Sequence, residues 1–500
     1  MKPAGAALQT LRPFLDGVFT DPARDEWLQV QEPACGRPWA RIPRGSEEDV
    51  RRAAAGARRA FEEGWGRTAP GERADLLDQA AAALEARSEE FARCESRDTG
   101  KPLRLARELD IPRAVANLRF FAGALRHDET PCHESAGVLN YTSRRPLGPV
   151  ALITPWNLPL YLLTWKLAPA LAMGNTVVAK PSEWTPGTAT LLAGLLAEIL
   201  PPGVFQMVHG LGETAGRALV RDPDIRAVSF TGGTATGAEV ARSAAPAFKK
   251  LSLELGGKNP TLVFADADLE EAAAGAVRAA FTNQGQICLC GSRILVEASV
   301  LKPFREALVE RVRALRLGDP ADPATDLGAL ISAEHRDRVE SYLALARDEG
   351  GRFLTGGGRP PMPEPLAGGY WLEPALVEGL PAASRCATEE IFGPVASLHP
   401  FRDEAEALRL ANGVRYGLCA SVWTRDLDRA HRLGHDLEAG MVWVNTWLLR
   451  DLRTPFGGVK DSGLGREGGR WSLEFFSEAR NLCIRYCAGD VPAAQPSRPT

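Results

Sequence analysis

Short apolar runs alternate with helical stretches along the chain from residue 148 onward. Runs of Val, Ile and Leu that are apolar at every position are typical of a parallel sheet covered by helices. The expected strands are VALIT (150–154), NTVVAK (175–180), FQMVHG and AVSFTGG, and the expected helices between them are KLAPALAMG and GTATLLAGLLAEIL. This order predicts a series of βαβ units and therefore an α/β fold.

The alternation starts again at residue 258, which predicts a second α/β domain. NPTLVF and SRILV are expected strands, and DLEEAAAGAVRAAF and residues 299–315 are expected helices. The stretch TGGGRPPMPEPLAGG (355–369) is predicted to be a loop because Gly and Pro dominate it.

The chain before residue 127 is expected to be rich in helix. SEEDVRRAAAGARRAFEEGW (46–65) opens with Ser46 followed by Glu48, as an N-capped amphipathic helix does. Residues 71–100 repeat the pattern and end in Gly. Residues 105–126 continue it, with Pro112 in a first turn or at a kink.

Composition and charge exclude several classes of partner. The net charge is −4 and the Lys and Arg residues are scattered, so no nucleic-acid partner is expected. The nine cysteines are odd in number and irregularly spaced, which favours a reducing cytoplasm over a secreted disulfide framework. A small molecule is therefore the expected partner.

Two segments were weighed as targeting or membrane sequences. Residues 1–17 have no sustained apolar core before Gln9 and Arg12, so a signal peptide is not expected. Residues 147–165 carry no charge over 19 positions, but three prolines and an asparagine argue against a membrane helix. We expect a buried strand, a turn at ProTrpAsn and the start of a helix.

Two residues are candidates for chemistry on local grounds. Cys288 follows a Gly-Gln pair in TNQGQICLCGSRI, an unusual setting for a cysteine that only packs, although buried structural cysteine is the commoner case. Glu254 lies between Leu253 and Leu255 in a strand-like run. Burial would raise its pKa toward that of a general base, and a structural salt bridge is the alternative.

Two further segments are candidates for phosphate and ribose binding. SFTGGTATGAEVAR (229–242) is a strand, a Gly-rich turn and a helix whose N-terminus suits a pyrophosphate, but it lacks the GxGxxG fingerprint and a simple connector is the alternative. In KPSEWTP (180–186), Lys180 is suited to a ribose hydroxyl. Glu183 is suited to a 2′-hydroxyl and would repel a 2′-phosphate; a solvated Lys-Glu pair is the alternative.

A metal site is not expected. HRLGH (431–435) places two histidines four residues apart, but no Glu lies between them and no third ligand is evident. A solvated helix face explains the pair.

Seven motifs together resemble the aldehyde dehydrogenase superfamily. They occur in the family's order and span residues 10 to 487; they are PWN at 155, KPSE at 180, FTGGTATG at 230, LELGGK at 253, GQIC at 285, EEIFGPV at 389 and PFGGVKDSGLGREGG at 455. The resemblance implies a Rossmann-like NAD-binding domain, an α/β catalytic domain, and a small β element that joins subunits into homodimers or homotetramers. The expected bounds are 1–126 and 148–254 for NAD binding, 255–455 for catalysis, 127–147 and 471–487 for oligomerisation, and 488–500 for a flexible tail.

The same resemblance implies a role for each matched residue. Cys288 would be the nucleophile toward the aldehyde, Asn157 and the Cys288 N–H would bind the oxyanion, and Glu254 would activate water. The implied NAD-binding residues are Trp156, Lys180 and Glu183 on the adenosine and phosphate side, Gly232 and Gly237 around the pyrophosphate turn, Glu390 at the nicotinamide ribose and Phe392 at the ring. Position 233 is Gly where the family often has Ser, so that contact would pass to backbone N–H or water.

A narrower resemblance concerns the substrate. VNTWLLRDLRTPFGG (444–458), IPRAVANLRFF (111–121) and the CLC at the nucleophile resemble the semialdehyde dehydrogenases of aromatic degradation. Their substrates carry a carboxylate far from the aldehyde, and Arg113 and Arg450 match the arginines that would bind it. Arg453 is a weaker candidate, and surface ion pairs are the alternative for Arg113 and Arg450.

The expected activity is NAD-dependent oxidation of 2-aminomuconate 6-semialdehyde to 2-aminomuconate, a step of tryptophan or aminophenol breakdown. 2-Hydroxymuconate semialdehyde is the nearest alternative substrate. A broader aliphatic or retinal-type enzyme is favoured if Arg113 and Arg450 do not converge. A catalytically silent scaffold predicts missing site residues, whereas Cys288, Glu254 and Asn157 are present.

Cys290 lies two residues after Cys288. In an extended segment both side chains would point to one side, so a regulatory disulfide or oxidation at this pair stays open.

Overall fold

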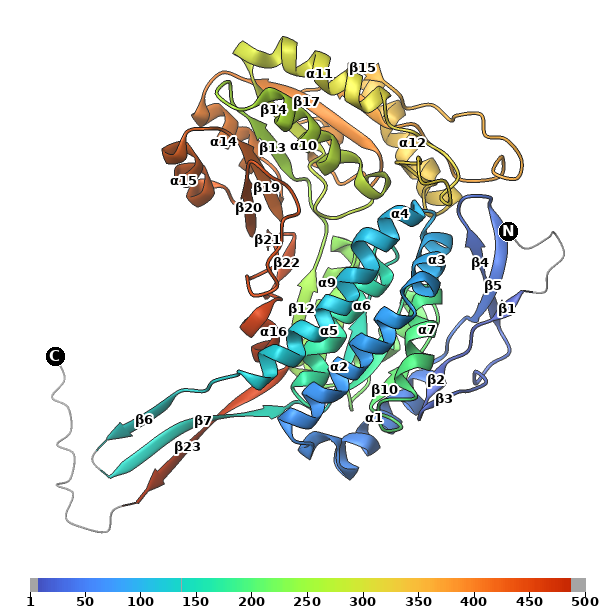
Figure 1. The fold of residues 1–500 in the computed structure, drawn as a ribbon, viewed down its shortest axis with the longest axis vertical. Helices are drawn as coiled ribbons and strands as arrows, with labels where there is room; N and C mark the ends of the chain where they lie inside the picture. The colour runs from blue at the N-terminus through green and yellow to red at the C-terminus, as the bar shows by residue number, and fades with distance from the viewer. Residues whose placement is uncertain (1–7, 136, 487–500) are drawn as a thin grey trace.

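Two large, mainly parallel sheets form the centre of the protein (Figure 1). The structure is a computed structural model that describes residues 8–135 and 137–486. The first sheet has eight strands and the second has seven. The predicted α/β fold class, with two rounds of alternating strands and helices, is confirmed.

The first sheet contains all the strands expected between residues 148 and 254. In spatial order its strands are β22 (Gly463–Leu464), β12 (Lys250–Glu254), β11 (Ala227–Thr231), β8 (Pro149–Ile153), β9 (Thr176–Lys180), β10 (Phe205–Met207), β2 (Phe14–Leu15) and β3 (Val18–Phe19). The five central strands are parallel. Ile153 is paired with Lys180, and Thr231 with Glu254, so the carboxyl ends of these strands lie along one edge. Open α/β sheets bind ligands at that edge.

Helices cover both faces of the first sheet. One face packs on α2 (Pro70–Ala86), α3 (Ser88–Thr99), α5 (Ile111–Arg126), α6 (Pro159–Ala172) and α7 (Gly187–Leu196). The other face packs on α1 (Glu47–Glu63), α8 (Arg217–Arg221) and α9 (Thr234–Ala244). In β8, Val150 and Leu152 belong to the first core and Ala151 and Ile153 to the second. This alternation explains why the strand is apolar at every position.

The second sheet carries the remaining alternation. Its strands in spatial order are β15 (Arg352–Thr355), β16 (Ala375–Glu378), β17 (Val395–Phe401), β14 (Arg293–Glu297), β13 (Pro260–Val263), β19 (Cys419–Trp423) and β20 (Met441–Val444). Its helices are α10 (Leu269–Phe281), α11 (Leu301–Arg313), α12 (Ala333–Asp348), α13 (Arg385–Thr388), α14 (Glu404–Asn412) and α15 (Leu427–Asp436). Residues 356–374, between β15 and β16, contain no helix or strand, as the Gly and Pro content predicted.

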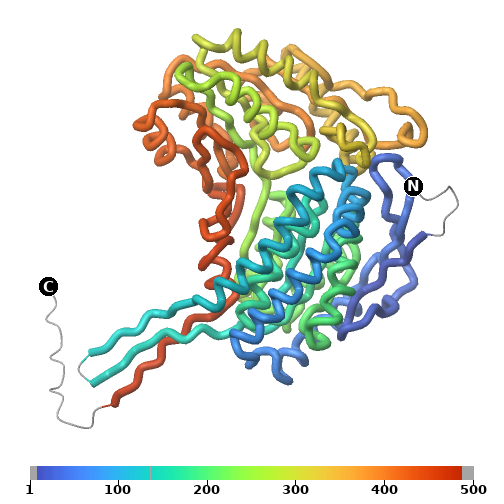
Figure 2. Tube along the Cα trace, viewed as in Figure 1, coloured from blue at the N-terminus to red at the C-terminus, as the bar shows by residue number. Residues whose placement is uncertain are grey.

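A three-stranded antiparallel sheet projects from the body (Figures 1 and 2). It consists of β6 (Cys132–Ser135), β7 (Val138–Pro146) and β23 (Ser477–Arg485), and β23 follows α16 (Gly469–Phe475). Residues from both predicted oligomerisation segments therefore pair in one sheet. The predicted tail at 488–500 lies outside the described residues.

The expectation of a helix-rich N-terminal part is wrong for residues 9–43. β1 (Gln9–Thr10), β5 (Arg37–Pro43) and β4 (Trp27–Glu32) form a small sheet of their own. In β4 and β5 a buried Val30 and Ala40 lie among exposed neighbours, the pattern of a strand with one covered face.

The helices after residue 46 differ from expectation in detail. Ser46 caps α1 through a capping box with Asp49, in place of Glu48. Residues 71–100 form two helices because the chain bends at Arg87, and Gly100 ends the second in the left-handed conformation with φ 75°. Pro112 lies in the first turn of α5, directly after a π-helical turn, η2 (Ala106–Asp110). The remaining short elements are α4 (Leu103–Leu105), β18 (Tyr416–Gly417), β21 (Val459–Lys460), η1 (Trp65–Arg67), η3 (Gly212–Gly216), η4 (Ala245–Ala247), η5 (Thr282–Gly285) and η6 (Ala298–Val300).

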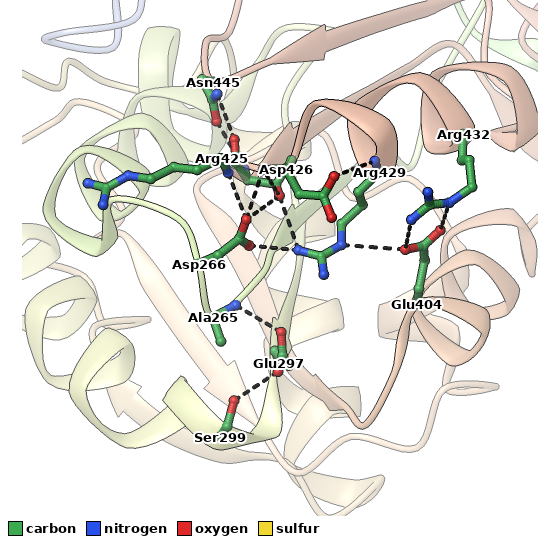
Figure 3. Close-up of polar contacts among 11 residues, drawn as sticks. Ala265, Asp266, Glu297, Ser299, Glu404, Arg425, Asp426, Arg429, Arg432 and Asn445 are labelled. Atoms are coloured by element: carbon green, nitrogen blue, oxygen red, sulfur yellow. Dashed lines mark hydrogen bonds and ion pairs between the residues drawn. The ribbon is translucent and has the colours of Figure 1, made fainter.

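Asp266, just after β13, forms hydrogen bonds to residues at the start of α15 (Figure 3). Its carboxylate accepts hydrogen bonds from the Thr424 hydroxyl at 2.8 Å, from the N–H groups of Arg425 and Asp426 at 2.9 Å each, and from the Arg429 guanidinium at 2.7 Å. Burial alone would raise the pKa of Asp266, but these hydrogen bonds outweigh it and lower the pKa.

We expect Asp266→Ala to destabilise the second sheet. Each hydrogen bond to a charged group contributes about 1.5–3 kcal/mol, and partial exposure of this carboxylate puts the expected total loss at about 2 kcal/mol. Thermal unfolding should show a Tm lower by about 2 °C, because the shift falls as the unfolding entropy grows with chain length. Arg425→Ala is the matched control, because only its backbone N–H contacts Asp266; an equal drop in both variants would contradict this role.

No helix within residues 8–135 and 137–486 is long and apolar enough to cross a membrane. His431 and His435 lie on the exposed face of α15. Over the same described residues, no group of three His, Cys, Asp or Glu side chains is arranged to hold a metal ion.

Candidate active site

The candidate nucleophile lies in a turn between α10 and β14, beside the carboxyl edge of the first sheet. Asn283, Gln284 and Gly285 have φ of 54°, 57° and 70°, so three successive residues adopt the left-handed conformation. A Cβ on Gly285 would lie 2.2 Å from the Gly393 carbonyl oxygen, so only glycine fits there. Strained backbone of this kind is concentrated at functional sites.

Cys288 and Cys290 do not lie in an extended segment. The Cys290 N–H donates to the Ile287 carbonyl at 2.9 Å, which closes a turn around Cys288. Cys290 is buried in the hydrophobic core, whereas Cys288 is half-buried. The two thiols therefore have different surroundings, and both are free thiols.

The surroundings of the Cys288 thiol disfavour the thiolate. Burial raises its pKa, the charges of Glu254 and Glu390 and the nearby Cys290 raise it further, and Arg450 acts in the opposite direction. The Cys288 carbonyl accepts a hydrogen bond from the Asn259 side-chain amide at 2.7 Å, which fixes the backbone behind the thiol. Attack on an aldehyde therefore requires a base to take the thiol proton.

Asn157 is buried in the turn between β8 and α6 and is hydrogen-bonded to the loop that contains Cys288. Its Nδ2 donates to the Gln286 carbonyl at 2.9 Å, and its Oδ1 has no hydrogen-bond partner among the described residues. Its backbone carbonyl accepts from Lys101 Nζ at 3.0 Å and from Asn283 Nδ2 at 3.1 Å. Since an amide has two N–H groups, one donor of Asn157 remains for a ligand.

Glu254 ends β12 and is 4% exposed. Burial raises its pKa well above the ordinary value, the negative charge of Glu467 adds to the effect, and Lys166 acts against it. Lys166 pairs with Glu467 at 2.6 Å, and within the described part of the chain Glu254 has no ion pair and its Oε1 has no hydrogen-bond partner. The alternative of a structural salt bridge at Glu254 is therefore wrong.

Lys180 is the last residue of β9, which pairs with β8, and Glu183 lies three residues further on. Lys180 is 3% exposed, its Nζ donates to the Pro181 carbonyl at 3.1 Å, and it lies 3.6 Å from Glu183. Burial lowers the pKa of Lys180. The alternative of a solvated pair is wrong for the lysine. His209, at the end of the neighbouring strand β10, is also buried, and both of its ring nitrogens have no partner among the described residues.

Three glycines in and after the turn between β11 and α9 differ in the space around them. A Cβ on Gly233 would meet nothing within 4 Å, and no side chain caps α9. Gly232 lies in the turn, where a Cβ would meet the Phe230 ring at 2.5 Å. Gly237 lies in the first turn of α9, where a Cβ would be 2.4 Å from Leu255.

An aromatic group joins the two sheets near Glu390. The Trp156 ring lies edge-on to Phe392 with centroids 5.3 Å apart, and to His335 at 5.2 Å. Glu390 accepts a hydrogen bond from the Gly257 N–H at 2.9 Å. Trp156 therefore packs against Phe392. The resemblance implied different ends of the dinucleotide for these two residues.

Arg113 and Arg450 converge on one tryptophan. The guanidinium of Arg113 lies 5.6 Å from the Trp165 ring centroid, and that of Arg450 lies 5.1 Å from it. Arg113 Nε donates to Asn117 at 3.2 Å while its Nη2 is buried without a partner, and Arg450 Nη1 donates to the Tyr161 hydroxyl at 3.0 Å.

Neither of these two arginines forms an ion pair with an acidic residue in the described chain, so the surface-ion-pair alternative is wrong. Arg453, by contrast, is exposed and pairs with Asp451 at 2.5 Å.

Several residues around the site were not found from the sequence. Tyr161, Trp165 and Lys166 lie on α6, and Lys101 and Glu467 are buried near Asn157 and Glu254 respectively. The signal for Lys166 was available, because it is a charged residue in the apolar run LYLLTWKLAPALA. Lys101 and Glu467 carry no such local signal, since Gly100 and Pro102 flank Lys101, and Arg466 and Gly468 flank Glu467.

Comparisons with known proteins agree with this arrangement. The sequence profile described as the aldehyde dehydrogenase family matches residues 19–482. A 2-aminomuconic semialdehyde dehydrogenase from Danio rerio is 48% identical over 91% of this chain and 94% of the relative. A 2-hydroxymuconic semialdehyde dehydrogenase from Pseudomonas sp. strain CF600 is 46% identical over 96% of this chain and all of the relative.

A solved structure gives the same result at the level of the fold. The betaine aldehyde dehydrogenase from Staphylococcus aureus, solved in complex with NAD⁺, superposes with a TM-score of 0.93 at 35% identity, covering 96% of each chain. With a profile match over most of its length and relatives close to half identical, this chain belongs to the aldehyde dehydrogenase family.

Proposed function

We propose that the protein oxidises a semialdehyde with a carboxylate at its far end, using NAD as the oxidant. The observation that carries the proposal is the pair of guanidinium groups, Arg113 and Arg450, that lie against Trp165 without an acidic partner in the described residues. Two such cations held in a largely apolar setting favour an anionic ligand. Their convergence disfavours a broader aliphatic or retinal-type enzyme.

The substrate we propose is 2-aminomuconate 6-semialdehyde, which would be converted to 2-aminomuconate. Relatives named for this activity are up to 48% identical to the chain, and relatives named for the 2-hydroxymuconic semialdehyde reach 46%. The second substrate therefore stays as the alternative. A comparison of kcat/KM for the two semialdehydes tests the choice, and a higher value for the hydroxy compound would reverse it.

The chemistry we assign to Cys288 is covalent. Its sulfur adds to the aldehyde carbon while the thiol proton passes to a base, and the carbonyl oxygen becomes an alkoxide. Loss of hydride from that carbon leaves the acyl group on Cys288 as a thioester. Water then hydrolyses the thioester, which releases the carboxylic acid and restores the thiol.

Asn157 is the oxyanion donor in this proposal, together with the Cys288 N–H. The side chain is buried, and its second amide N–H is free because the first is bonded to Gln286. A donor fixed in advance of the reaction stabilises developing negative charge most effectively in a site of low polarity.

Glu254 is the proposed base that activates the hydrolytic water. Its Oε1 is buried without a partner among the described residues, so it can accept a proton. Its raised pKa brings the carboxylate closer to the working range of a general base. Its negative charge acts on the Cys288 thiol, which is consistent with a place beside the acyl group.

The residues at the sheet edge fit NAD. The uncapped N-terminus of α9 beside the open Gly233 suits a pyrophosphate, with Gly232 in the same turn, and Lys180 and Glu183 suit the adenosine ribose. Glu390 would hold the nicotinamide ribose, and Phe392 with Trp156 would bound the ring. When bound, NAD supplies the acceptor for the hydride. Gly237 would act indirectly, by letting α9 pack close to Leu255.

The assembly we propose is a homodimer or homotetramer joined through the projecting sheet of β6, β7 and β23. All four residues of β6 are exposed, so its open edge is available for pairing. We propose residues 1–126 and 148–254 for NAD binding, 255–455 for catalysis, and 127–147 with 471–487 for oligomerisation. Free cysteines throughout the described residues suit a reducing cytoplasm.

Arg450→Ala tests the carboxylate site. Loss of one charged hydrogen bond of about 1.5–3 kcal/mol should raise KM for the muconate semialdehydes by about 10- to 150-fold. A neutral aldehyde should be affected much less, because it has no group for the arginine to bind. Steady-state NADH formation measures both.

Arg453→Ala is the matched control, since this exposed arginine three residues away pairs with Asp451. It should leave both KM values unchanged. Equal losses on charged and neutral substrates in Arg450→Ala would show that the arginine supports the fold and does not select the substrate. Absence of NADH formation with any aldehyde in the wild-type protein would revive a silent scaffold.

A further inference from the structure

A buried ion pair lies directly behind the proposed oxyanion donor. Lys101 and Asp110 are both 0% exposed, and the distance between Lys101 Nζ and Asp110 Oδ2 is 2.6 Å. Glu95, also fully buried, has Oε1 3.9 Å from the same ammonium. Burying these charges costs free energy, and such pairs are often no more stabilising than apolar residues of the same volume. Stability alone is therefore a poor reason for this pair.

The ammonium makes one further contact, and it is to Asn157. Lys101 Nζ donates to the Asn157 backbone carbonyl at 3.0 Å, and Asn283 Nδ2 donates to the same oxygen at 3.1 Å. Asn157 lies in the irregular turn between β8 and α6, where no strand or helix fixes its backbone. These two donors therefore hold the peptide group from which the Asn157 side chain extends.

The local backbone is built to bring the pair together. Gly100 ends α3 in the left-handed conformation, and the Ser96 hydroxyl donates to the Lys101 carbonyl at 2.7 Å, so Lys101 turns inward at the end of the helix. Asp110 is the last residue of the π-helical turn η2. Single π-helical turns within helices are frequent at functional sites.

We propose that Lys101, held by Asp110, is a positioning residue for Asn157 in the oxidation. The inference rests on the proposed role of Asn157 as oxyanion donor. Lys101 touches neither substrate nor thiol; it fixes the Asn157 carbonyl so that the amide meets the developing negative charge. A displacement of about 1 Å in such a donor costs on the order of 10²-fold in rate.

The test compares two double variants. Lys101→Met/Asp110→Leu removes the donor and its partner with little change in volume, and should lower kcat about 10²-fold, comparable to loss of an oxyanion donor. Lys101→Gln/Asp110→Asn keeps a neutral donor toward Asn157 and should recover most of that loss. KM for NAD and the rate at which iodoacetamide alkylates Cys288 should not change, because neither requires an oxyanion donor.

A cycle with Asn157→Ala separates the inference from the proposed function. If Lys101 acts through Asn157, adding Lys101→Met/Asp110→Leu to Asn157→Ala should cause little further loss of kcat. Multiplied losses, or a wild-type kcat in the folded Met/Leu variant, would overturn the inference. A wild-type kcat in Asn157→Ala would instead overturn the proposed role of Asn157.

Two further variants serve as a control and as a replacement for a variant that does not fold. Lys249→Met removes a largely buried lysine just before the amino end of β12. Its Nζ donates a hydrogen bond to the Asp222 carbonyl and to no other group of the described residues, so the change should leave kcat unchanged. If the Met/Leu variant does not fold, Asp110→Asn alone decides: it releases Lys101 from its charged partner and should lower kcat with KM for NAD constant. Unchanged kcat in Asp110→Asn would then count against the positioning role.

Discussion

Replacing Cys288 with alanine should abolish NADH formation with every aldehyde. Loss of a catalytic nucleophile typically costs on the order of 10⁶-fold in kcat. The fold should persist, because the side chain is half-buried and the turn is held through backbone contacts from Asn259 and Ile287. Absorbance of NADH measures the loss, and circular dichroism checks the fold.

Cys290→Ala is the matched control, two residues away. Cys290 is buried in the hydrophobic core, so its replacement should reduce stability and leave kcat close to the wild-type value. Turnover retained in Cys288→Ala and lost in Cys290→Ala would move the nucleophile to Cys290.

Glu254→Gln should slow hydrolysis of the thioester by about 10²- to 10⁴-fold, the usual contribution of a general base. The acyl group should then accumulate on Cys288, where mass spectrometry of the intact protein detects it after mixing with NAD and aldehyde. A first turnover of NADH should precede the slow steady state. A variant that turns over slowly without an accumulated acyl group would contradict the assignment.

The pH dependence of hydrolysis gives a second measurement on Glu254. A general base acts in its ionised form, and burial raises the pKa of this carboxyl well above the usual range. The rate of thioester hydrolysis in the wild-type protein should therefore rise with pH through a range well above the ordinary glutamate pKa of about 4.3. This rise should disappear in Glu254→Gln.

The strands and helices around the site were predicted from sequence because their signals are local. Strands β8 and β9 are apolar at every position since helices cover both sheet faces, and Gly100 marks the end of α3. Strands β4 and β5 were missed because each buries only one face and their apolar residues are few. The expectation of a helix-rich N-terminal part therefore rested on the helical patterns after residue 46.

The site itself was predicted only to the level of its matched motifs. Three successive residues, 283–285, are left-handed and create the turn at Cys288. Two of them are not glycine, and no local sequence pattern predicts that conformation for such residues. Because of this turn, Cys288 and Cys290 do not lie in an extended segment. The hydrogen bond from Lys101 to Asn157 joins residues 56 positions apart. A contact over that separation depends on the tertiary fold and has no local sequence pattern.

Helix α6 gives the site a fixed length. Asn157 lies just before its first residue, Tyr161 lies in its first turn, and Trp165 lies one turn further on. At a rise of about 1.5 Å per residue, Tyr161 and Trp165 lie about 6 Å apart along the helix axis. Arg113 and Arg450 contact these two rings, so on the proposed function the substrate carboxylate would bind at a fixed distance along α6 from the aldehyde that Asn157 would bind. Shorter semialdehydes of the same charge would leave one end unbound, so the enzyme should discriminate among them by the number of carbons between the two groups.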